Sequence, residues 1–483
     1  MAYRYGDRYQ MTLIPRSIEE FVPEDHPVRA YDAFVESLDF TELGIEIDPD
    51  RVGNPEYDPK AMFKLLVFGY SYGIKSSRKL EREAHNNMCF IWLTGGLRPD
   101  HKTIAEFRRR NTSALKRIFR QSVRMCMGLK LIKGNVLFVD GTKIRANASR
   151  GRTHTKPQYE KLLARIDDRI KELLDECEAV DRKEKGQGSW VKMDSELADK
   201  KKLKERIRQA LEEFGPDDHG TKAVNMTDPD CAIMNSPQGS HASYNVQSVV
   251  DDEHGLVVHA EPVSDTNDAR QFARQIGKAN EVLGSPCEAA CADAGYSDVG
   301  ELEKIDGKDI TVIVPSQKQA LHHPKEDPFD KSHFTYDPGT DTYTCPEGHT
   351  LRFSFTQTRG KRQYRMVDSN NCRTCPNFGQ CTKSPRGRNI IRLRNEEVKL
   401  KLEAQYTEES SQIIYKRRKT KVELVFGHIK RNLKTDSFLL RGIEGAAAEV
   451  SILALCFNMT RAITILGVKK LIDVFRSIRM VPA

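Results

Sequence analysis

The sequence predicts an α/β protein in which an all-α N-terminal region precedes a mixed sheet that carries two inserts. Three observations support this prediction. Residues 1–128 have apolar positions at helical spacing, short apolar runs typical of buried strands begin at residue 136, and the segments 155–215 and 317–395 interrupt those runs with a different composition. We therefore expect a helical domain at 1–128 and an α/β domain at 129–483.

Length and charge set the broad class. A chain of 483 residues can form two or three domains with a core in each. It has 77 Lys and Arg against 69 Asp and Glu, a formal charge of +8. Basic side chains gather at 359–365, 383–394 and 416–421, where they would suit a phosphate backbone. A solvated helix face is the alternative for the last cluster.

The sequence contains no run of about eighteen apolar residues, so we expect no membrane span. The first residues lack the apolar segment of a secretory signal. Eleven cysteines in such a chain indicate reduced thiols or metal ligands, not a disulfide framework. We expect a cytoplasmic protein.

The N-terminal region reads as a compact set of helices. Residues 61–70 have a wide apolar face, and residues 103–110 form a helix that ends in cations. A helical domain of this kind suits DNA binding. The alternative is a domain that only packs and dimerises, because no clear helix-turn-helix pattern is present.

The strands follow in order. Residues 136–139, Val-Leu-Phe-Val, are β-branched and aromatic, which predicts a buried strand that ends at Asp140, with Gly141 opening a turn. Residues 244–250 and 255–263 predict a hairpin. An amphipathic helix at 265–283, with Asp265 as its N-cap, and strands at 287–292 and 309–315 come next. Strand, hairpin, helix, strand, helix, strand is the order of a ribonuclease-H-like sheet, and residues 446–465 predict a buried helix against it.

The first insert predicts an antiparallel helical hairpin. Apolar residues recur at intervals of three and four, the spacing of a heptad seam: Leu163, Ile166, Ile170, Leu173, Cys177 and Val180, and then Leu203, Ile207, Leu211 and Phe214. Gly186 and Gly188 break the pattern between them. The seam serves either packing within the hairpin or dimerisation.

The second insert is rich in Pro, Gly and Cys. Cys372 and Cys375 form a Cys-x2-Cys pair, and Cys345, Cys381 or His349 could complete a tetrahedral zinc site. The spacing differs from that of a standard two-knuckle ribbon. The alternative is a small β-rich insert with free thiols.

Three acidic residues stand out by their contexts. Asp140 and Asp293 each follow a predicted strand, and Glu423 lies in a basic helical stretch two turns before Lys430. A strand-end carboxylate either caps its own turn or binds a cation, since its desolvation is otherwise costly. Lys430 could contact a phosphate or be an ordinary surface lysine.

These blocks resemble a known family. Asp140-Gly-Thr, Asp293-Ala-Gly-Tyr and the helix from Glu423 to Lys430 are similar to the catalytic blocks of bacterial insertion-sequence transposases of the DDE type, IS-four-like branch. The resemblance extends over nearly the whole chain. One departure concerns the family's Tyr and Arg that precede the Glu: its register falls on Lys416 and Lys419, whereas Tyr415 and Arg418 stand one residue early.

The resemblance implies a ribonuclease-H-like catalytic domain and a reaction. Asp140, Asp293 and Glu423 would hold two Mg²⁺ ions, with Mn²⁺ as an alternative, for cleavage at element ends and transfer of the 3′-hydroxyl to target DNA. The partner would be double-stranded DNA, bound by a homodimer through residues that include Arg417, Arg418, Lys419 and Lys430. Other readings are a nuclease or recombinase of the same fold and a non-enzymatic DNA-binding protein derived from a transposase.

Overall fold

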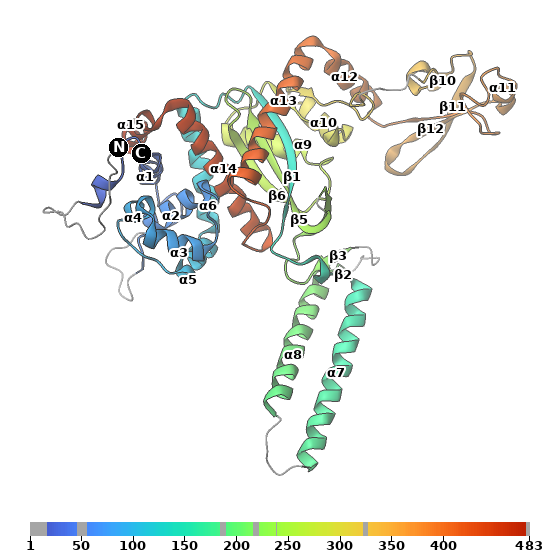
Figure 1. Ribbon diagram of the computed structural model, residues 1–483. Coiled ribbons are helices and arrows are strands. Elements are labelled where there is room, and N and C mark those ends of the chain that lie inside the picture. The colour runs from blue at the N-terminus through green and yellow to red at the C-terminus, as the bar shows by residue number, and fades with distance from the viewer. Residues whose placement is uncertain are drawn as a thin grey trace, which may run out of the picture. The chain divides into compact units, whose positions relative to one another are not determined.

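The computed structural model describes residues 17–45, 56–183, 190–215, 222–237, 239–321 and 327–479, which form a mixed α/β protein (Figure 1). The chain divides into two compact units. The first comprises Met1–Asp268, Arg274–Cys287 and Arg417–Ala483, and the second comprises Ala269–Ala273 and Glu288–Lys416.

The N-terminal part of the first unit is helical, as the sequence predicts. Two of its helices begin at aspartates whose side chains accept backbone hydrogen bonds: Asp58 from the N–H groups of Lys60 and Ala61, and Asp100 from the N–H of Thr103. The helices are η1 (Ile18–Phe21), α1 (Val28–Glu36), α2 (Pro59–Ser71), α3 (Ser77–Asn86), α4 (Met88–Leu93), α5 (His101–Arg110) and α6 (Thr112–Gly128).

Helices from the end of the chain pack on this region. α14 (Gly442–Leu466) contacts α2, α6 and strand β6 (Val257–Val263), and α15 (Val468–Arg479) contacts α1. The rings of Phe34 and Phe475 meet edge to face at 5.7 Å between α1 and α15. The prediction of a buried helix at 446–465 is therefore confirmed.

By length and composition alone, α14 could cross a membrane, with a mean hydropathy of 1.5 over its most apolar window. That window is 67% buried within the protein. Its buried polar side chains have protein partners: Glu449 accepts a hydrogen bond from the N–H of Leu439, and Asn458 accepts one from the N–H of Val257. Since core helices meet the same two criteria, α14 is weak evidence for a membrane span.

The sheet of the first unit is built on β5 (Gly239–Asp251). This strand pairs antiparallel with β1 (Val136–Arg145), β6 and β4 (Ala232–Ser236). The hairpin predicted from 244–250 and 255–263 is thereby confirmed. The prediction that the first strand ends at Asp140 is wrong, because β1 stays paired with β5 from Leu137 opposite Asp251 to Arg145 opposite Ser243.

The first insert is the predicted helical hairpin. α7 (Lys156–Lys183) and α8 (Trp190–Glu212) lie side by side, and at their base β2 (Thr153–Thr155) pairs antiparallel with β3 (Ala223–Asn225) (Figure 1). The Cys177 and Val180 side chains of the predicted seam, and its break at 186–188, lie outside the described residues. The hairpin core includes Tyr159, Leu163, Ile166, Ile170, Leu203, Ile207, Leu211 and Phe214.

The helix predicted at 265–283 is shorter than expected. α9 runs from Phe272 to Leu283, so the prediction that Asp265 caps it is wrong. The reason lies at Asp268, whose Oδ1 accepts hydrogen bonds from the side-chain amides of Asn245 at 2.7 Å and Gln247 at 2.6 Å. These bonds attach the residues before α9 to β5.

In the second unit, β7 (Ala289–Cys291) pairs in parallel with β8 (Thr311–Ile313), as the two predicted strands require. Between them lie η3 (Ala294–Tyr296) and α10 (Val299–Asp306). α12 (Glu396–Thr407) packs on β8 and α10, and α13 (Glu409–Gly427) leads from the second unit into the first.

The second insert is β-rich, as predicted. Its antiparallel sheet has the order β13-β12-β11-β10-β9, and a short helix, α11 (Ser369–Arg373), follows β12. The strands are β9 (Thr335–Asp337), β10 (Thr342–Thr344), β11 (Thr350–Thr356), β12 (Arg362–Met366) and β13 (Asn389–Arg392).

Candidate active site

Asp140 lies in the middle of β1, not at its end. Alternate residues of a strand share a face, so Asp140 shares one with Phe138, Thr142 and Ile144. Its Oδ1 accepts a hydrogen bond from the N–H of Gly141 at 2.8 Å, and its Oδ2 lies 3.5 Å from Nη1 of Arg418. The Asp140 and Arg418 side chains are 23% and 15% exposed, so this ion pair is largely shielded from water.

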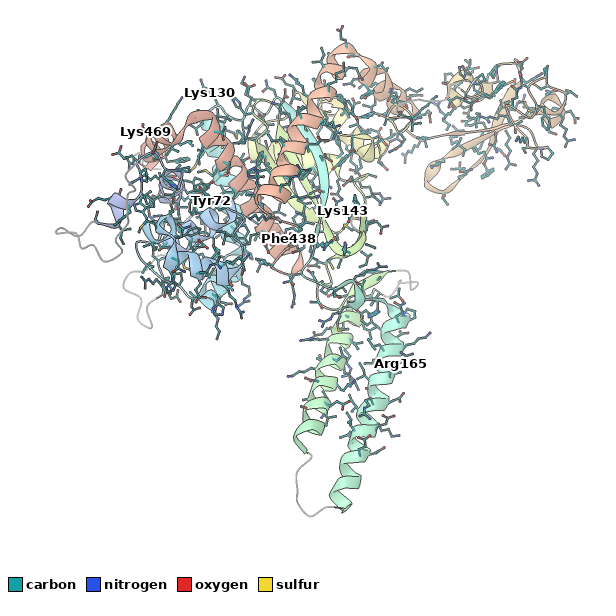
Figure 2. All side chains as sticks on the ribbon, in the orientation of Figure 1. Tyr72, Lys130, Lys143, Arg165, Phe438 and Lys469 are labelled. Carbon is teal, nitrogen blue, oxygen red and sulfur yellow. The ribbon has the colours of Figure 1, made fainter. Side chains whose placement is uncertain are left out.

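Gly141 is required by packing on the opposite face of β1. A Cβ atom there would lie 2.5 Å from Nε2 of Gln247 and 2.7 Å from Oδ1 of Asp268. The next residue on that face is Lys143, which Figure 2 labels. It donates a hydrogen bond to the carbonyl of Asn235 at 3.0 Å. The glycine of the Asp-Gly pair thus makes room for a buried polar network and does not open a turn.

Helix α13 is fixed to the Asp140 face of β1. Val422 and Val425 of the helix are buried, and so is Ile429 in the turn that follows it. Arg418, in the middle of α13, contacts Asp140, and Nζ of Lys430, beyond the end of the helix, donates to Oγ1 of Thr142 at 2.5 Å. The second half of the helix therefore crosses the stretch of β1 from residue 140 to residue 142.

Glu423 lies between these two attachment points. Its side chain is 65% exposed, and its Oε1 lies 4.0 Å from Nζ of Lys419. After Gly427 the helix widens into a π-helical turn, η6 (His428–Asn432), which carries Lys430. Partial burial lowers the pKa of Lys430 from its ordinary value. Glu423 is thus an accessible carboxylate on the helix that crosses β1, the strand that carries Asp140.

The remaining predicted DNA-binding residue of α13 has a carboxylate partner. Arg417 forms an ion pair with Asp252 at 3.0 Å, next to the carbonyl groups of Asp252 and Glu253 that accept from Lys421. Like Arg418, Arg417 is therefore engaged with an acidic side chain in this structure.

Asp293 belongs to the second unit, two residues after β7. Its Oδ1 accepts a hydrogen bond from the N–H of Gly295 at 2.8 Å and so caps η3. Tyr296 at the end of this turn is buried. The Asp-Ala-Gly-Tyr motif is thus a tight turn that presents a half-buried carboxylate.

The four predicted zinc ligands, Cys345, Cys372, Cys375 and Cys381, line one cavity in the insert of the second unit, together with His349. Across the described ranges, no group of three or more His, Cys, Asp or Glu side chains is arranged to hold a metal ion. Among these described residues, neither the four cysteines nor Asp140, Asp293 and Glu423 form such a group.

A strand carboxylate and a helical carboxylate flanked by Arg and Lys are suited to phosphoryl transfer, because carboxylates bind Mg²⁺ and the cations bind phosphate. Two parts of the chain match families of proteins that carry out a particular kind of phosphoryl transfer. Residues 344–463 match the family described as a transposase DDE domain, and residues 16–110 match the transposase domain family DUF772. These two matches support a DDE-type transposase, as the resemblance implies.

The match to the DDE domain includes Glu423 but begins after Asp140 and Asp293 in the chain. DDE transposase domains in general act on DNA strands and use divalent metal ions. Among solved structures, the cryo-EM structure of the piggyBac transposase synaptic complex with hairpin DNA shares 8% identity, covering 94% of this chain and 80% of that one, at a TM-score of 0.33, too low to establish a common fold. No curated protein matches the chain.

Proposed function

We propose that this transposase cleaves phosphodiester bonds at the ends of an insertion sequence and transfers the freed 3′-hydroxyl to target DNA, on a ribonuclease-H-like scaffold. The observation that carries the proposal is the attachment of α13 to β1. Arg418 and Lys430 hold the helix at two points, so the segment with Glu423 crosses the strand that carries Asp140. The order of strand, hairpin, helix and parallel strand pair supports the scaffold.

Asp140, Asp293 and Glu423 are the residues that would hold two Mg²⁺ ions, or Mn²⁺ in their place, with Asp140 shared. Their carboxylate oxygens are the ligands that Mg²⁺ prefers. When bound, the ions would activate the attacking oxygen and stabilise the leaving oxygen. Asp140 is held in place on β1, because its Oδ1 accepts from the N–H of Gly141 and its Oδ2 lies 3.5 Å from Nη1 of Arg418.

Arg418 has a defined part in this proposal. Its guanidinium lies against the Asp140 carboxylate. Because a guanidinium can donate two hydrogen bonds to a phosphate, Arg418 would help to position the scissile phosphate next to Asp140. Arg417, Lys419 and Lys430 would contact the flanking phosphates.

Double-stranded DNA, as element end and as target, is the proposed partner. Several arginines of the basic clusters serve the insert internally: Arg362 pairs with Asp341, Arg388 donates to the carbonyl of Cys381, and Arg392 lies over the ring of Tyr336. The phosphate-binding surface is therefore narrower than the clusters suggest. The exposed basic residues of the clusters are Lys361, Arg365, Lys383, Arg386, Arg394, Lys416, Arg417 and Lys419.

We further propose that residues 1–128 bind the element ends, that the protein acts as a homodimer on DNA, and that it works in the cytoplasm. The cationic end of α5 is only partly available for DNA. Arg108 is buried and donates to the hydroxyl of Tyr70, and Arg109 and Arg110 both donate to Glu106. Exposed side chains elsewhere on these helices would have to supply the base contacts.

The test uses purified full-length protein, Mg²⁺, a DNA fragment ending in the inverted repeat that flanks the gene, and a supercoiled target plasmid. We expect a 3′-hydroxyl at the repeat boundary and covalent joining of that end to the plasmid. Cleavage without joining would indicate a nuclease instead. Specific binding without cleavage would indicate a DNA-binding protein derived from a transposase.

A further inference from the structure

The insert of the second unit has a small apolar core for its size. Its buried side chains are Phe334, Tyr343, Leu351, Tyr364, Met366, Cys372 and Ile390. Bodies this small bury too little apolar surface to be stable on that account alone, and they commonly rely on a metal or on disulfides. The cysteines of the insert are free thiols in this structure.

Four of these thiols come together from separate parts of the insert. Cys345 follows β10, Cys372 lies in α11, and Cys375 and Cys381 lie in the loop beyond α11. All four line a single cavity of about 30 Å³. Residues 345 and 381 are far apart in the sequence, so the fold of the insert, and not local spacing, brings the four together.

Backbone N–H groups around the cavity reach three of the four sulfurs. The Sγ atoms of Cys345, Cys375 and Cys372 accept hydrogen bonds from the backbone N–H groups of His349 at 3.3 Å, Asn377 at 3.4 Å and Arg388 at 3.4 Å. Hydrogen bonds to sulfur stabilise the charged form, which is the form that binds metal.

Gly387 allows the backbone N–H of Arg388 to approach the sulfur of Cys372. It has φ +81°, and a Cβ atom there would lie 3.0 Å from Cβ of Met366 and 3.3 Å from Sγ of Cys372. A left-handed glycine without a side chain therefore lets the backbone come close enough for the N–H of Arg388 to reach the sulfur.

We propose that Cys345, Cys372, Cys375 and Cys381 bind one structural Zn²⁺ as a tetrathiolate. Zinc is the metal of choice because four thiolates and a closed tetrahedral shell define its structural sites. The four thiols do not form a closed metal site as they stand, so the walls of the cavity must draw together around the ion.

The guanidinium of Arg388 lies where it can balance the negative charge of the proposed zinc site. A zinc ion with four thiolates carries a net charge of about −2. The guanidinium of Arg388, which lines the same cavity, donates to the carbonyls of Cys381 and Phe329 at 2.8 Å and is fixed beside the sulfurs. His349 lines the cavity as well and its backbone N–H serves Cys345, but four thiols already complete a tetrahedral shell without its imidazole.

This zinc is separate from the proposed catalytic metals, so its test does not depend on transposition. Full-length protein is purified without chelator from zinc-supplemented medium, and its metal content is measured by plasma mass spectrometry. We expect about one zinc per chain in the wild type and in the control Cys89→Ser, whose cysteine lies outside the insert. We expect none in Cys372→Ser/Cys375→Ser.

A second measurement covers the case in which the double variant does not fold. Zinc in the wild type is exchanged for Co²⁺, and the thiolate-to-cobalt charge-transfer band gives the number of sulfur ligands. A tetrathiolate spectrum supports the proposal. A folded wild type without zinc, a cobalt site with fewer than four sulfurs, or a disulfide between Cys372 and Cys375 would overturn it.

Discussion

Replacing Asp140 with Asn separates the catalytic role of this residue from its structural role. The substitution keeps the size of the side chain and an oxygen that can accept from the N–H of Gly141. It removes the negative charge that faces Arg418 at 3.5 Å. Cleavage and strand transfer should therefore collapse, while folding and DNA binding persist.

The structural cost can be bounded from this ion pair. At an effective dielectric constant of about 20, charges this far apart attract by roughly 5 kcal/mol before desolvation is subtracted. Ion pairs that retain much solvent contact give up to about 1 kcal/mol net, whereas removing one partner of a fully buried pair costs about 3–5 kcal/mol. Because Arg418 keeps 15% exposure, we expect a loss of about 1–2 kcal/mol, or a few degrees in Tm.

The catalytic cost is larger. Metal ligation supplies several kcal/mol of transition-state stabilisation, and a loss of about 4 kcal/mol slows a reaction roughly a thousandfold. The assay is Mg²⁺-dependent cleavage of an end-containing DNA, with thermal unfolding and DNA binding measured on the same preparations. Glu423→Gln should lose as much activity with almost no change in Tm, because its side chain is 65% exposed.

Two controls isolate the cause. Asp252→Asn removes a comparable ion pair from α13, that of Arg417 at 3.0 Å, without removing a proposed metal ligand. Asp265→Asn changes an exposed aspartate outside the site. Both should keep most of the cleavage activity. A well-folded Asp140→Asn protein that cuts DNA within tenfold of the wild type would refute the three-carboxylate hypothesis.

Two further predictions concern the neighbours of Asp140. Arg418→Ala removes the cation that competes for this carboxylate, so Mn²⁺ should bind several-fold more tightly by calorimetry while cleavage falls; unchanged Mn²⁺ affinity would mean that the guanidinium does not compete. Gly141→Ala places a methyl group 2.5 Å from Nε2 of Gln247 and 2.7 Å from Oδ1 of Asp268. Overpacking of this kind costs about 1–3 kcal/mol in chemical denaturation, and an unchanged midpoint would contradict the buried network.

The elements that the sequence predicts well are those whose apolar pattern is long and regular. The hairpin of α7 and α8 follows from a repeat of three and four, and α14 follows from a helix that is apolar on all sides. The strands β5 and β6 follow from two β-branched runs joined by a polar turn. In each case local pattern and tertiary packing require the same structure.

The two wrong predictions share one physical cause. The Asp140-Gly141 pair indicates a turn by local chemistry, and Asp265 indicates a helix cap. Both assignments are overridden by Asn245 and Gln247 of β5, which bind Asp268 and occupy the space beside Gly141. The signal was present as two amide side chains at alternate, buried positions of the strand, but their partner could not be known without the fold.

The position of Arg418 shows how a departure from the family register can keep a cation at the site. Counted from Glu423, the family places its arginine at residue 419, and this chain has Lys419 there. Residues 418, 422, 425 and 429 are spaced by four, three and four, so Arg418 continues the buried stripe of α13, while position 419 lies beside Glu423 on the exposed flank. A cation at 418 is therefore directed to the strand by the same periodicity that packs the helix. If Lys419 instead held the arginine role, Lys419→Ala would impair cleavage more than Arg418→Ala, and the contact with Asp140 makes us expect the reverse.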